Sequence, residues 1–350
     1  MDMATLKQIW EDIKTLDQKQ REQLRRMIGY ASAVGDMKNK EEAMTEHRFS
    51  GGRFCVHCNG KHIVRNGHAS NGMQRYLCRD CGKTFVITTN SLLSHSRKNL
   101  AVWQKYLDCF MNGDSLRKSA KECGINLPTS FQWRHKILDA LEPFMKKELS
   151  GIVEADETFY SVSYKGNHSR SHDFQMPRKS RQRGHSIHHS GLSREWVCVP
   201  CALNHDGRSF AQAAKLGKIS TKALERAFEN RIAPGSTLCT DHEKAYHRFS
   251  DRGGLQLIQV RRNQTVRGIY GIQRMNSYHS RLKAFTDRFR GVSTKYLNNY
   301  LRWFSFLDDR TRTADDKELL LTTLILFSGK QKRNRDLARR PSLPFPVPAG

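Results

Sequence analysis

The sequence predicts a multidomain α+β protein with an N-terminal helix, a small metal-bound module, a helical segment and a larger α/β domain. Three observations support this fold class. The chain has 350 residues, which is too long for one ordinary domain. Two Cys-x-x-Cys pairs mark a compact module before residue 90. From residue 151 onward, short β-rich runs are interspersed with helical patterns.

The composition indicates a nucleic-acid partner. The chain has 60 Lys and Arg against 34 Asp and Glu, a formal net charge of +26. Such a surplus favours a polyanion, with nucleic acid as the first candidate and an anionic membrane as the rival. There is neither an apolar run long enough to span a membrane nor a signal-peptide pattern. We therefore expect a cytoplasmic protein without a membrane partner, nucleoid-associated in a prokaryote, whose nine cysteines stay reduced.

The N-terminal segment, residues 1–50, has nine basic and nine acidic side chains and is therefore neutral. Apolar side chains recur on one helical face within residues 4–30, namely Leu6, Ile9, Trp10, Ile13 and Leu16. We expect a helix that either packs on its own chain or forms an oligomer contact, because periodicity alone does not identify the partner. Residues 34–52 are polar and predict a linker.

Residues 51–90 are expected to form a zinc ribbon. Four thiolates are available in two Cys-x-x-Cys pairs separated by 19 residues: Cys55, Cys58, Cys78 and Cys81. Four protein ligands fill the tetrahedral coordination of Zn²⁺, so the metal is expected to be structural. Four unrelated buried cysteines are the alternative. His57 and His62 are not expected to be ligands.

Residues 91–148 are expected to form a helix-turn-helix DNA-binding domain. Ala120 allows two helices to approach, Gly124 makes the turn, and Leu127–Leu138 forms the second helix. An ordinary helical hairpin is the alternative. The side chains expected to contact DNA are Arg117, Lys118, Thr129, Ser130, Gln132, Arg134, His135 and Lys136.

Two acids at strand ends suggest a divalent-metal site. Asp156 lies in the apolar-rich run 151–160, and Asp241 ends the β-prone run 236–241. Adjacent strand ends would place both carboxylates on one Mg²⁺ or Mn²⁺ site, although a single strand-end acid is usually a cap or a surface residue. Thirty-five residues after Asp241, Asn276 begins a helical face that also carries His279 and Lys283. An amide oxygen binds Mg²⁺, and Lys283 is placed to hold a DNA phosphate; a solvated helix face is the alternative.

Taken together, these motifs resemble the insertion-sequence transposases of family 1595. The matching residues are Val153-Glu-Ala-Asp-Glu-Thr158, Thr240, Asp241, Tyr246, Asn276, His279, Leu282, Lys283, Phe289 to Leu297, Asn299-Tyr-Leu301 and Trp303. The resemblance covers roughly residues 53–310. It implies an RNase H-like, retroviral-integrase-like α/β catalytic domain over residues 149–328. In that domain Asn276 replaces the third acid of the usual triad, with Lys283 as its companion.

The resemblance also implies an activity. The expected enzyme binds double-stranded DNA at the element's terminal repeats, cuts it with Mg²⁺ or Mn²⁺, and joins the 3′-hydroxyl to target DNA. It implies a homodimer or larger assembly. The expected catalytic residues are Asp156, Asp241, Asn276, His279 and Lys283. The rivals are a domesticated, non-catalytic DNA-binding regulator and a hydrolytic nuclease of the same fold.

The same family fold predicts the order of elements. Strands are expected near 152–159, 195–203, 208–215, 236–241 and 256–260. Helices are expected near 220–231, 273–286 and 294–328, the last either continuous or broken. Cys198 and Cys201 are expected to be buried in a strand. The segment 161–194 has seven Lys or Arg and one Asp, and is either a mobile loop or a DNA clamp using Arg178, Lys179, Arg181 and Arg183. Residues 329–350 are basic and Pro-rich and predict a disordered tail.

Overall fold

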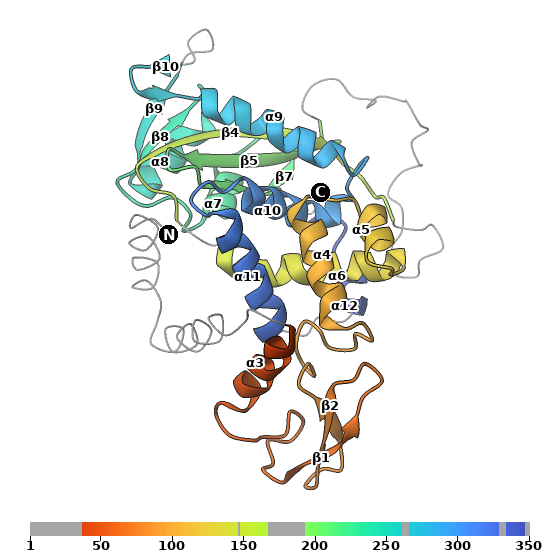
Figure 1. The fold of residues 1–350 in the computed structure, drawn as a ribbon. Helices are drawn as coiled ribbons and strands as arrows, with labels where there is room; N and C mark the ends of the chain where they lie inside the picture. The colour runs from red at the N-terminus through yellow and green to blue at the C-terminus, as the bar shows by residue number, and fades with distance from the viewer. Residues whose placement is uncertain (1–36, 146–147, 167–192, 261–265, 329–333, 347–350) are drawn as a thin grey trace. The chain divides into compact units, whose positions relative to one another are not determined.

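The computed structural model describes residues 37–145, 148–166, 193–260, 266–328 and 334–346 (Figure 1). These residues form two compact units. The first combines the described residues before 142 with residues 312–334, and the second combines those of 142–311 with those after 334. The expected helix at 4–30 and the basic residues Arg178, Lys179, Arg181 and Arg183 lie outside the described residues.

The first unit begins with a helix where the polar composition of residues 34–52 predicts a linker. This helix, α3 (Met37–Phe49), buries Ala43 and Met44, which are 2% and 3% exposed. Near its end, the guanidinium of Arg48 donates hydrogen bonds of 2.6–3.0 Å to the carbonyl oxygens of Ile87 and Thr89. The linker prediction is wrong, because a short apolar contact and one long-range arginine contact hold this segment as a helix.

A three-stranded antiparallel sheet follows and carries the two cysteine pairs. Its strands lie in the order β1 (Ile63–His68), β2 (Gln74–Cys78) and β3 (Thr84–Val86). Tyr76 pairs with Phe85 across the ladder, and their rings stack with centroids 5.6 Å apart. Both side chains are buried. So small an apolar centre indicates that the ribbon needs a further stabilising element.

The rest of the first unit is helical. The segment after the ribbon forms α4 (Leu100–Met111), α5 (Leu116–Glu122) and α6 (Leu127–Leu141). From far along the chain, α11 (Ala314–Phe327) packs against α3, α4 and α6. Trp103 of α4 stacks on Trp133 of α6, with ring centroids 3.6 Å apart. Large aromatic side chains therefore form the centre of this helical unit.

The helical pattern at residues 294–328 is broken, as the sequence suggests. A 3-10 turn, η2 (Thr294–Tyr296), leads into α10 (Leu297–Asp308), and α11 starts after Thr313, which forms a capping box with Asp316. The two helices belong to different units. The chain therefore passes from the second unit back to the first after Thr311, whereas the sequence predicts that the catalytic domain ends at residue 328.

The second unit is built on a mixed β-sheet. After a 3-10 turn, η1 (Glu142–Met145), its strands are β4 (Ile152–Ser161), β5 (Trp196–Asn204), β6 (Ser209–Ala211), β7 (Lys215–Leu216), β8 (Thr237–Thr240) and β9 (Gln256–Gln259). The order is β6-β5-β4-β8-β9, with β7 also paired to β5. β5 is antiparallel to β4 and β6, while β4, β8 and β9 are mutually parallel neighbours. The strands expected from the sequence are confirmed, although the one at 208–215 is two short strands.

Helices cover both faces of this sheet. On one face, Val153 and Ala155 of β4 join α7 (Thr221–Phe228) and α8 (Ala245–Gly253) in a hydrophobic core. On the other, α9 (Gln273–Asp287) packs along β4 and β5, and α10 contacts β6 and α9 (Figure 1). Because side chains alternate along a strand, Glu154 and Asp156 project towards α9.

Four elements after residue 240 were not predicted. No element was expected at α8 or at the short hairpin of β10 (Val266–Arg267) with β11 (Tyr270–Gly271), which precedes α9. In the expected disordered tail, α12 (Asn334–Ala338) buries Leu337 to 2% exposure, and the Leu337 carbonyl accepts a hydrogen bond from the Tyr296 hydroxyl. The tail prediction is thus wrong at α12, because one leucine and its carbonyl anchor an otherwise polar segment.

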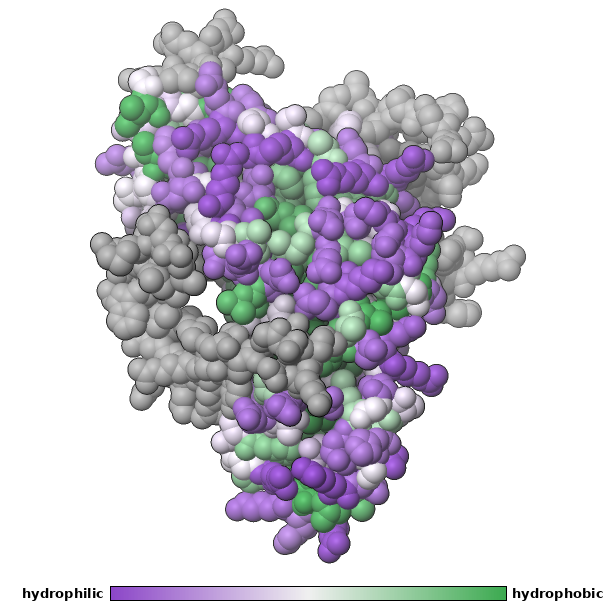
Figure 2. Space-filling model, viewed as in Figure 1, coloured by the Kyte–Doolittle hydropathy of each residue, from purple (hydrophilic) through white to green (hydrophobic). Residues whose placement is uncertain are grey.

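One face of the molecule is drawn in Figure 2. The face drawn in Figure 2 is largely hydrophilic, with small hydrophobic areas between the charged side chains. No helix among the described residues is long and apolar enough to cross a membrane.

Candidate functional site

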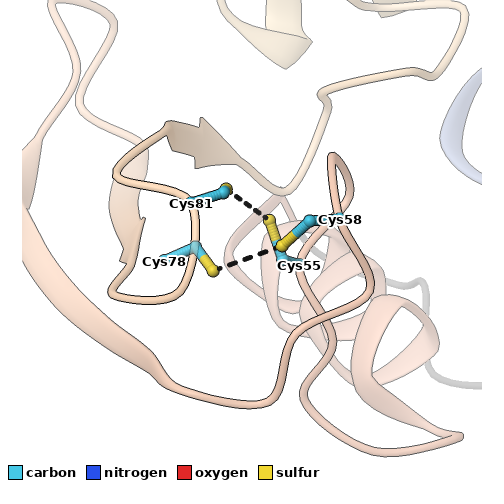
Figure 3. A group of neighbouring side chains, drawn as sticks. All are labelled: Cys55, Cys58, Cys78 and Cys81. Atoms are coloured by element: carbon cyan, nitrogen blue, oxygen red, sulfur yellow. Dashed lines mark hydrogen bonds between the residues drawn. The ribbon is translucent and has the colours of Figure 1, made fainter.

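Four cysteine sulfurs converge within the ribbon (Figure 3). Cys55 and Cys58 precede β1, while Cys78 ends β2 and Cys81 follows it. All four ligand atoms lie within 4.8 Å of one another, and the Cys55–Cys81 and Cys58–Cys78 sulfurs are each 3.7 Å apart. A tetrahedral site with Zn–S bonds of about 2.3 Å needs sulfurs about 3.8 Å apart. The predicted cysteine group is formed, and it can hold a zinc ion.

Backbone N–H groups favour the thiolate form that zinc requires. The N–H of His57 donates to the Cys55 sulfur and that of Gly60 to the Cys58 sulfur, each at 3.4 Å. Burial acts to raise the pKa of Cys55, but the N–H groups of His57 and Cys58 outweigh it and bring that pKa to about 7. The donor set therefore matches a structural metal site.

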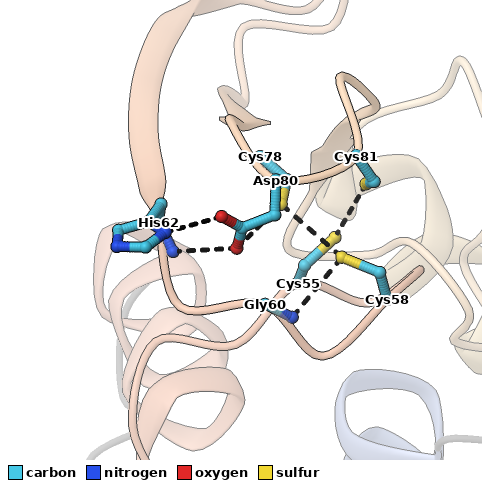
Figure 4. Close-up of polar contacts among 7 residues, drawn as sticks. All are labelled: Cys55, Cys58, Gly60, His62, Cys78, Asp80 and Cys81. Atoms are coloured by element: carbon cyan, nitrogen blue, oxygen red, sulfur yellow. Dashed lines mark hydrogen bonds and ion pairs between the residues drawn. The ribbon is translucent and has the colours of Figure 1, made fainter.

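A histidine–aspartate pair lies beside the cysteine group (Figure 4). The Asp80 carboxylate is 2.6 Å from Nδ1 of His62, whose side chain is 78% exposed. A Cβ atom on Gly60 would lie 2.0 Å from the Asp80 carboxylate, so a larger residue there would have to displace the Asp80 side chain. His62 thus contacts Asp80, which lies between the two cysteines of the second pair. As predicted, the group of four ligands does not include His62.

Two helices joined by a short turn, α5 and α6, are formed at the positions expected for the helix-turn-helix. Gly124 has a φ of +58°, in the left-handed region, and makes the turn between α5 and α6. The Ser115 side chain caps α5 by accepting the N–H of Lys118, and Asn126 accepts the N–H of Thr129 at the start of α6. Arg117 and Lys118 are exposed on α5, although Lys118 pairs with Asp114 at 2.8 Å.

Three of the residues expected to contact DNA are in the interior of this unit. Ser130, Arg134 and His135 are each 0% exposed. The Ser130 hydroxyl donates to the Leu116 carbonyl oxygen, and Arg134 donates to the Ser119 hydroxyl at 3.0 Å. Their prediction as contacts is wrong, because all three side chains are buried; those of Ser130 and Arg134 join α5 to α6. Thr129, Gln132 and Lys136 on α6 are partly exposed and keep access to solvent.

Asp156 lies in the middle of β4 and not at a strand end as expected, whereas Asp241 directly follows β8. Glu154 of β4 pairs with Cys239 of the parallel strand β8, so Asp156 and Asp241, each two residues further on, occupy equivalent positions. Burial raises the pKa of Asp156 to about 6; the N–H of Glu157 opposes this, and the negative charge of Asp241 adds to it. A divalent cation bound between two partly buried carboxylates would neutralise the repulsion between them.

The acid pair is an incomplete ligand set by itself. Within the described part of the chain, the four cysteines are the only group of three or more His, Cys, Asp and Glu whose ligand atoms lie within 4.8 Å of one another. Two carboxylates leave the remaining positions to an amide, to water or to a phosphate, which suits Mg²⁺.

Helix α9 runs beside β4 in the same direction. The N–H of Met275 donates to the Glu154 carboxylate at 3.0 Å, and Nδ1 of His279 lies 3.8 Å from the Asp156 carboxylate. Further along, the Lys283 ammonium donates to the carbonyl oxygen of Phe159. Asn276 is exposed one turn before His279, on the same side of the helix. The helix thus brings its expected site residues to the strand that carries Asp156.

Two of these side chains have lowered pKa values. Burial and then the charge of Lys283 lower the pKa of His279 to about 4, so the imidazole is neutral at pH 7. Burial lowers the pKa of Lys283, whose ammonium also lies 3.6 Å from the centroid of the Tyr160 ring. The Lys283 ammonium therefore already contacts Phe159 and Tyr160. The sequence instead suggests an ammonium that is available to bind a DNA phosphate.

Three residues near the acids, Glu154, Glu157 and Tyr246, were not expected to be catalytic. Glu154 receives the Met275 N–H, and Glu157, on the opposite face of β4, accepts a hydrogen bond of 3.0 Å from the Tyr246 hydroxyl. Burial, and then the charge of Asp156, raises the pKa of Glu157 to about 8. The sequence could have indicated Glu154 and Glu157, because the acids within residues 153–158 lie on both faces of the expected strand.

The remaining cysteine pair is structural. Cys198 and Cys201 are each 0% exposed in β5, as the apolar run around them predicts. Burial raises the pKa of both thiols, which makes thiolate chemistry unfavourable there.

Comparison with known proteins identifies the second unit. Residues 148–309 match the family model described as "ISXO2-like transposase domain". The chain is also 25% identical over 284 residues to "Uncharacterized protein in transposable element ISH50" of Halobacterium salinarum, a match covering 80% of this chain and 93% of that protein. Residues 148–309 are thus similar to the transposase domains of the insertion-sequence 1595 family, and the chain is similar to a protein of a transposable element.

Proposed function

We propose that the protein is an insertion-sequence transposase that binds the terminal repeats of its element and catalyses Mg²⁺- or Mn²⁺-dependent DNA cleavage and strand transfer. The observation that carries the proposal is the equivalent placement of Asp156 and Asp241 on neighbouring parallel strands within the matched domain. The mixed sheet with helices on both faces supports an RNase H-like fold for this unit.

The proposed reaction is phosphoryl transfer without a covalent enzyme intermediate. Asp156 and Asp241 would hold the metal and Asn276 would add a neutral oxygen, while the neutral His279 lies beside Asp156. When bound, the divalent cation supplies positive charge to the reacting phosphate and lowers the pKa of the attacking hydroxyl. Lys283, fixed by Phe159 and Tyr160, contributes a positive charge beside this site.

DNA binding is assigned to the basic surface of both units. In the first unit the proposed contacts are the solvent-accessible side chains of Arg117, Lys118, Thr129, Gln132 and Lys136. The proposed clamp residues, Arg178, Lys179, Arg181 and Arg183, lie outside the described residues. A structural Zn²⁺ on the four cysteines would hold the ribbon beside the helix-turn-helix. Assembly as a homodimer or larger complex remains part of this proposal.

The test uses the purified full chain, Mg²⁺, a labelled duplex carrying the element end, and a supercoiled target. Wild type is compared with Asp241→Asn, and with Asp251→Asn as a matched control on the exposed surface of α8. We expect wild type and the Asp251 variant to form joined product, and the Asp241 variant to bind DNA without forming any.

Each other outcome contradicts the proposal in a distinct way. Cleavage without joined product would favour a hydrolytic nuclease of this fold. DNA binding without any Mg²⁺-dependent product, equal in all three proteins, would leave a non-catalytic regulator.

A further inference from the structure

Helix α9 begins without a capping side chain of its own. Its N-cap residue is Ile272, and no side chain at that position bonds to the first turn. The first N–H groups of a helix have no acceptor within the helix, so a buried helix start needs one from elsewhere. Met275 lies in this first turn and is 0% exposed, so its N–H is shielded from water.

A carboxylate from the neighbouring strand supplies the missing acceptor. Glu154 of β4 is 3% exposed, and its Oε2 accepts the N–H of Met275 at 3.0 Å. The other oxygen, Oε1, lies 3.7 Å from Nε2 of His205, and the His205 carbonyl oxygen accepts a hydrogen bond of 3.0 Å from Arg274. A buried carboxylate is tolerated when donors surround it, and a helix N-terminus favours negative charge.

This contact fixes α9 along the strand that carries the first acid. Met275 contacts Glu154, His279 contacts Asp156, and Lys283 contacts Phe159, so helix and strand are matched at three successive levels. A helix rises about 1.5 Å per residue, so even a small slip of α9 would carry Asn276 and His279 away from Asp156.

We propose that Glu154 is a positioning residue: its buried carboxylate caps α9 from β4 and so sets where Asn276 and His279 stand beside Asp156. The cap is independent of any activity, but its consequence for catalysis rests on the proposed function. Glu154 itself touches no reacting atom and acts through the helix.

The experiment separates capping from charge. Glu154→Ala removes the acceptor, Glu154→Asp keeps the charge but shortens the reach, and Glu154→Gln keeps an acceptor oxygen at the same place. As a matched control, Thr313→Ala removes the cap of α11 in the other unit. Hydrogen exchange over residues 273–279, the Mn²⁺ affinity measured by electron paramagnetic resonance, and kcat and KM for DNA cleavage are then compared.

We expect the Ala and Asp variants to raise exchange at the start of α9 by about tenfold or more. Mn²⁺ affinity should fall about tenfold, the size of effect that groups supporting a metal ligand have. In cleavage, kcat should fall about 100-fold with little change in KM. Gln should restore all three readouts towards wild type, and Thr313→Ala should change exchange in α11 alone. If the Ala variant does not fold, comparing Glu154→Asp with Glu154→Gln tests the same effect of losing the acceptor.

Unchanged exchange in the Ala or Asp variant would overturn the cap. Faster exchange with unchanged Mn²⁺ affinity would overturn the positioning role. If wild type cleaves no DNA, the proposed function fails, and exchange and Mn²⁺ affinity still decide the inference by themselves.

Discussion

Arg134 on α6 donates a hydrogen bond of 3.0 Å to the hydroxyl of Ser119 on α5, and both residues are 0% exposed. A basic side chain on the second helix of a helix-turn-helix is usually assigned to DNA. Here it connects the two helices internally, whereas Arg117, on the exposed side of α5, remains free to reach a phosphate.

Arg134→Ala is expected to lower the free energy of unfolding by about 2–4 kcal/mol, because it opens a cavity and leaves the buried Ser119 hydroxyl without this donor. Urea unfolding followed by tryptophan fluorescence measures it, since Trp133 is the neighbouring residue on α6. The exposed Arg117→Ala should change stability by less than about 0.5 kcal/mol. Equal losses for the two variants would contradict the internal role of Arg134.

Arg117→Ala is expected to weaken DNA binding instead. Removing one phosphate contact should reduce the slope of log Kd against log salt by about 1 and should act alike on all DNA sequences. Fluorescence anisotropy over a salt series gives this slope. Arg226→Ala removes the same charge from the exposed side of α7 in the other unit and is the control. A slope that is the same for wild type and Arg117→Ala would remove Arg117 from the proposed contacts.

The strands of the second unit were predictable because local pattern determines them. The runs that form β5 and β8 are rich in buried residues, and β4 and β9 combine β-prone apolar residues with polar ones. α3 was missed because its apolar face amounts to Ala43 and Met44, and because Arg48 acts on carbonyls about forty positions away. Contacts between distant segments leave no periodic signal.

The candidate site was predictable in its residues but not in its geometry. Asp156 and Asp241 follow β-prone runs, which the sequence displays directly. Their equivalent placement depends on the pairing of Glu154 with Cys239, and no local pattern encodes that register. The sequence predicts a DNA contact for both Arg134 and Arg117, but Arg134 is buried whereas Arg117 is exposed. The catalytic roles of the acids and of Asn276 stay predictions.

Lys283 and Tyr160 are expected to be energetically coupled, because the ammonium lies 3.6 Å from the centroid of the partly buried ring. A double-mutant cycle with Lys283→Met and Tyr160→Leu should give a coupling energy of about 0.5–2 kcal/mol in unfolding. The same cycle with Lys222→Met, on the exposed side of α7, should give none. A coupling within error of zero for Lys283 and Tyr160 would show that the ring contact adds nothing to stability.

Zinc removal is expected to unfold the ribbon and spare the second unit. The ribbon has few large buried side chains besides Tyr76 and Phe85, so the free energy of metal binding, about 10–16 kcal/mol in zinc-finger peptides, would dominate its folding. Cys78→Ser should lose the roughly one zinc per chain that wild type holds, since three thiolates leave the tetrahedron incomplete.

Atomic absorption measures the zinc content, and hydrogen exchange over residues 53–88 shows whether the ribbon is folded. Cys123→Ala, at the end of α5 and outside the cysteine group, is the control and should keep its zinc. Exchange in β4 and β8 should be unchanged in both variants, because those strands belong to the other unit. Full zinc content in Cys78→Ser would contradict the four-cysteine site. Zinc loss with an unchanged ribbon would show that its aromatic pair suffices to fold it.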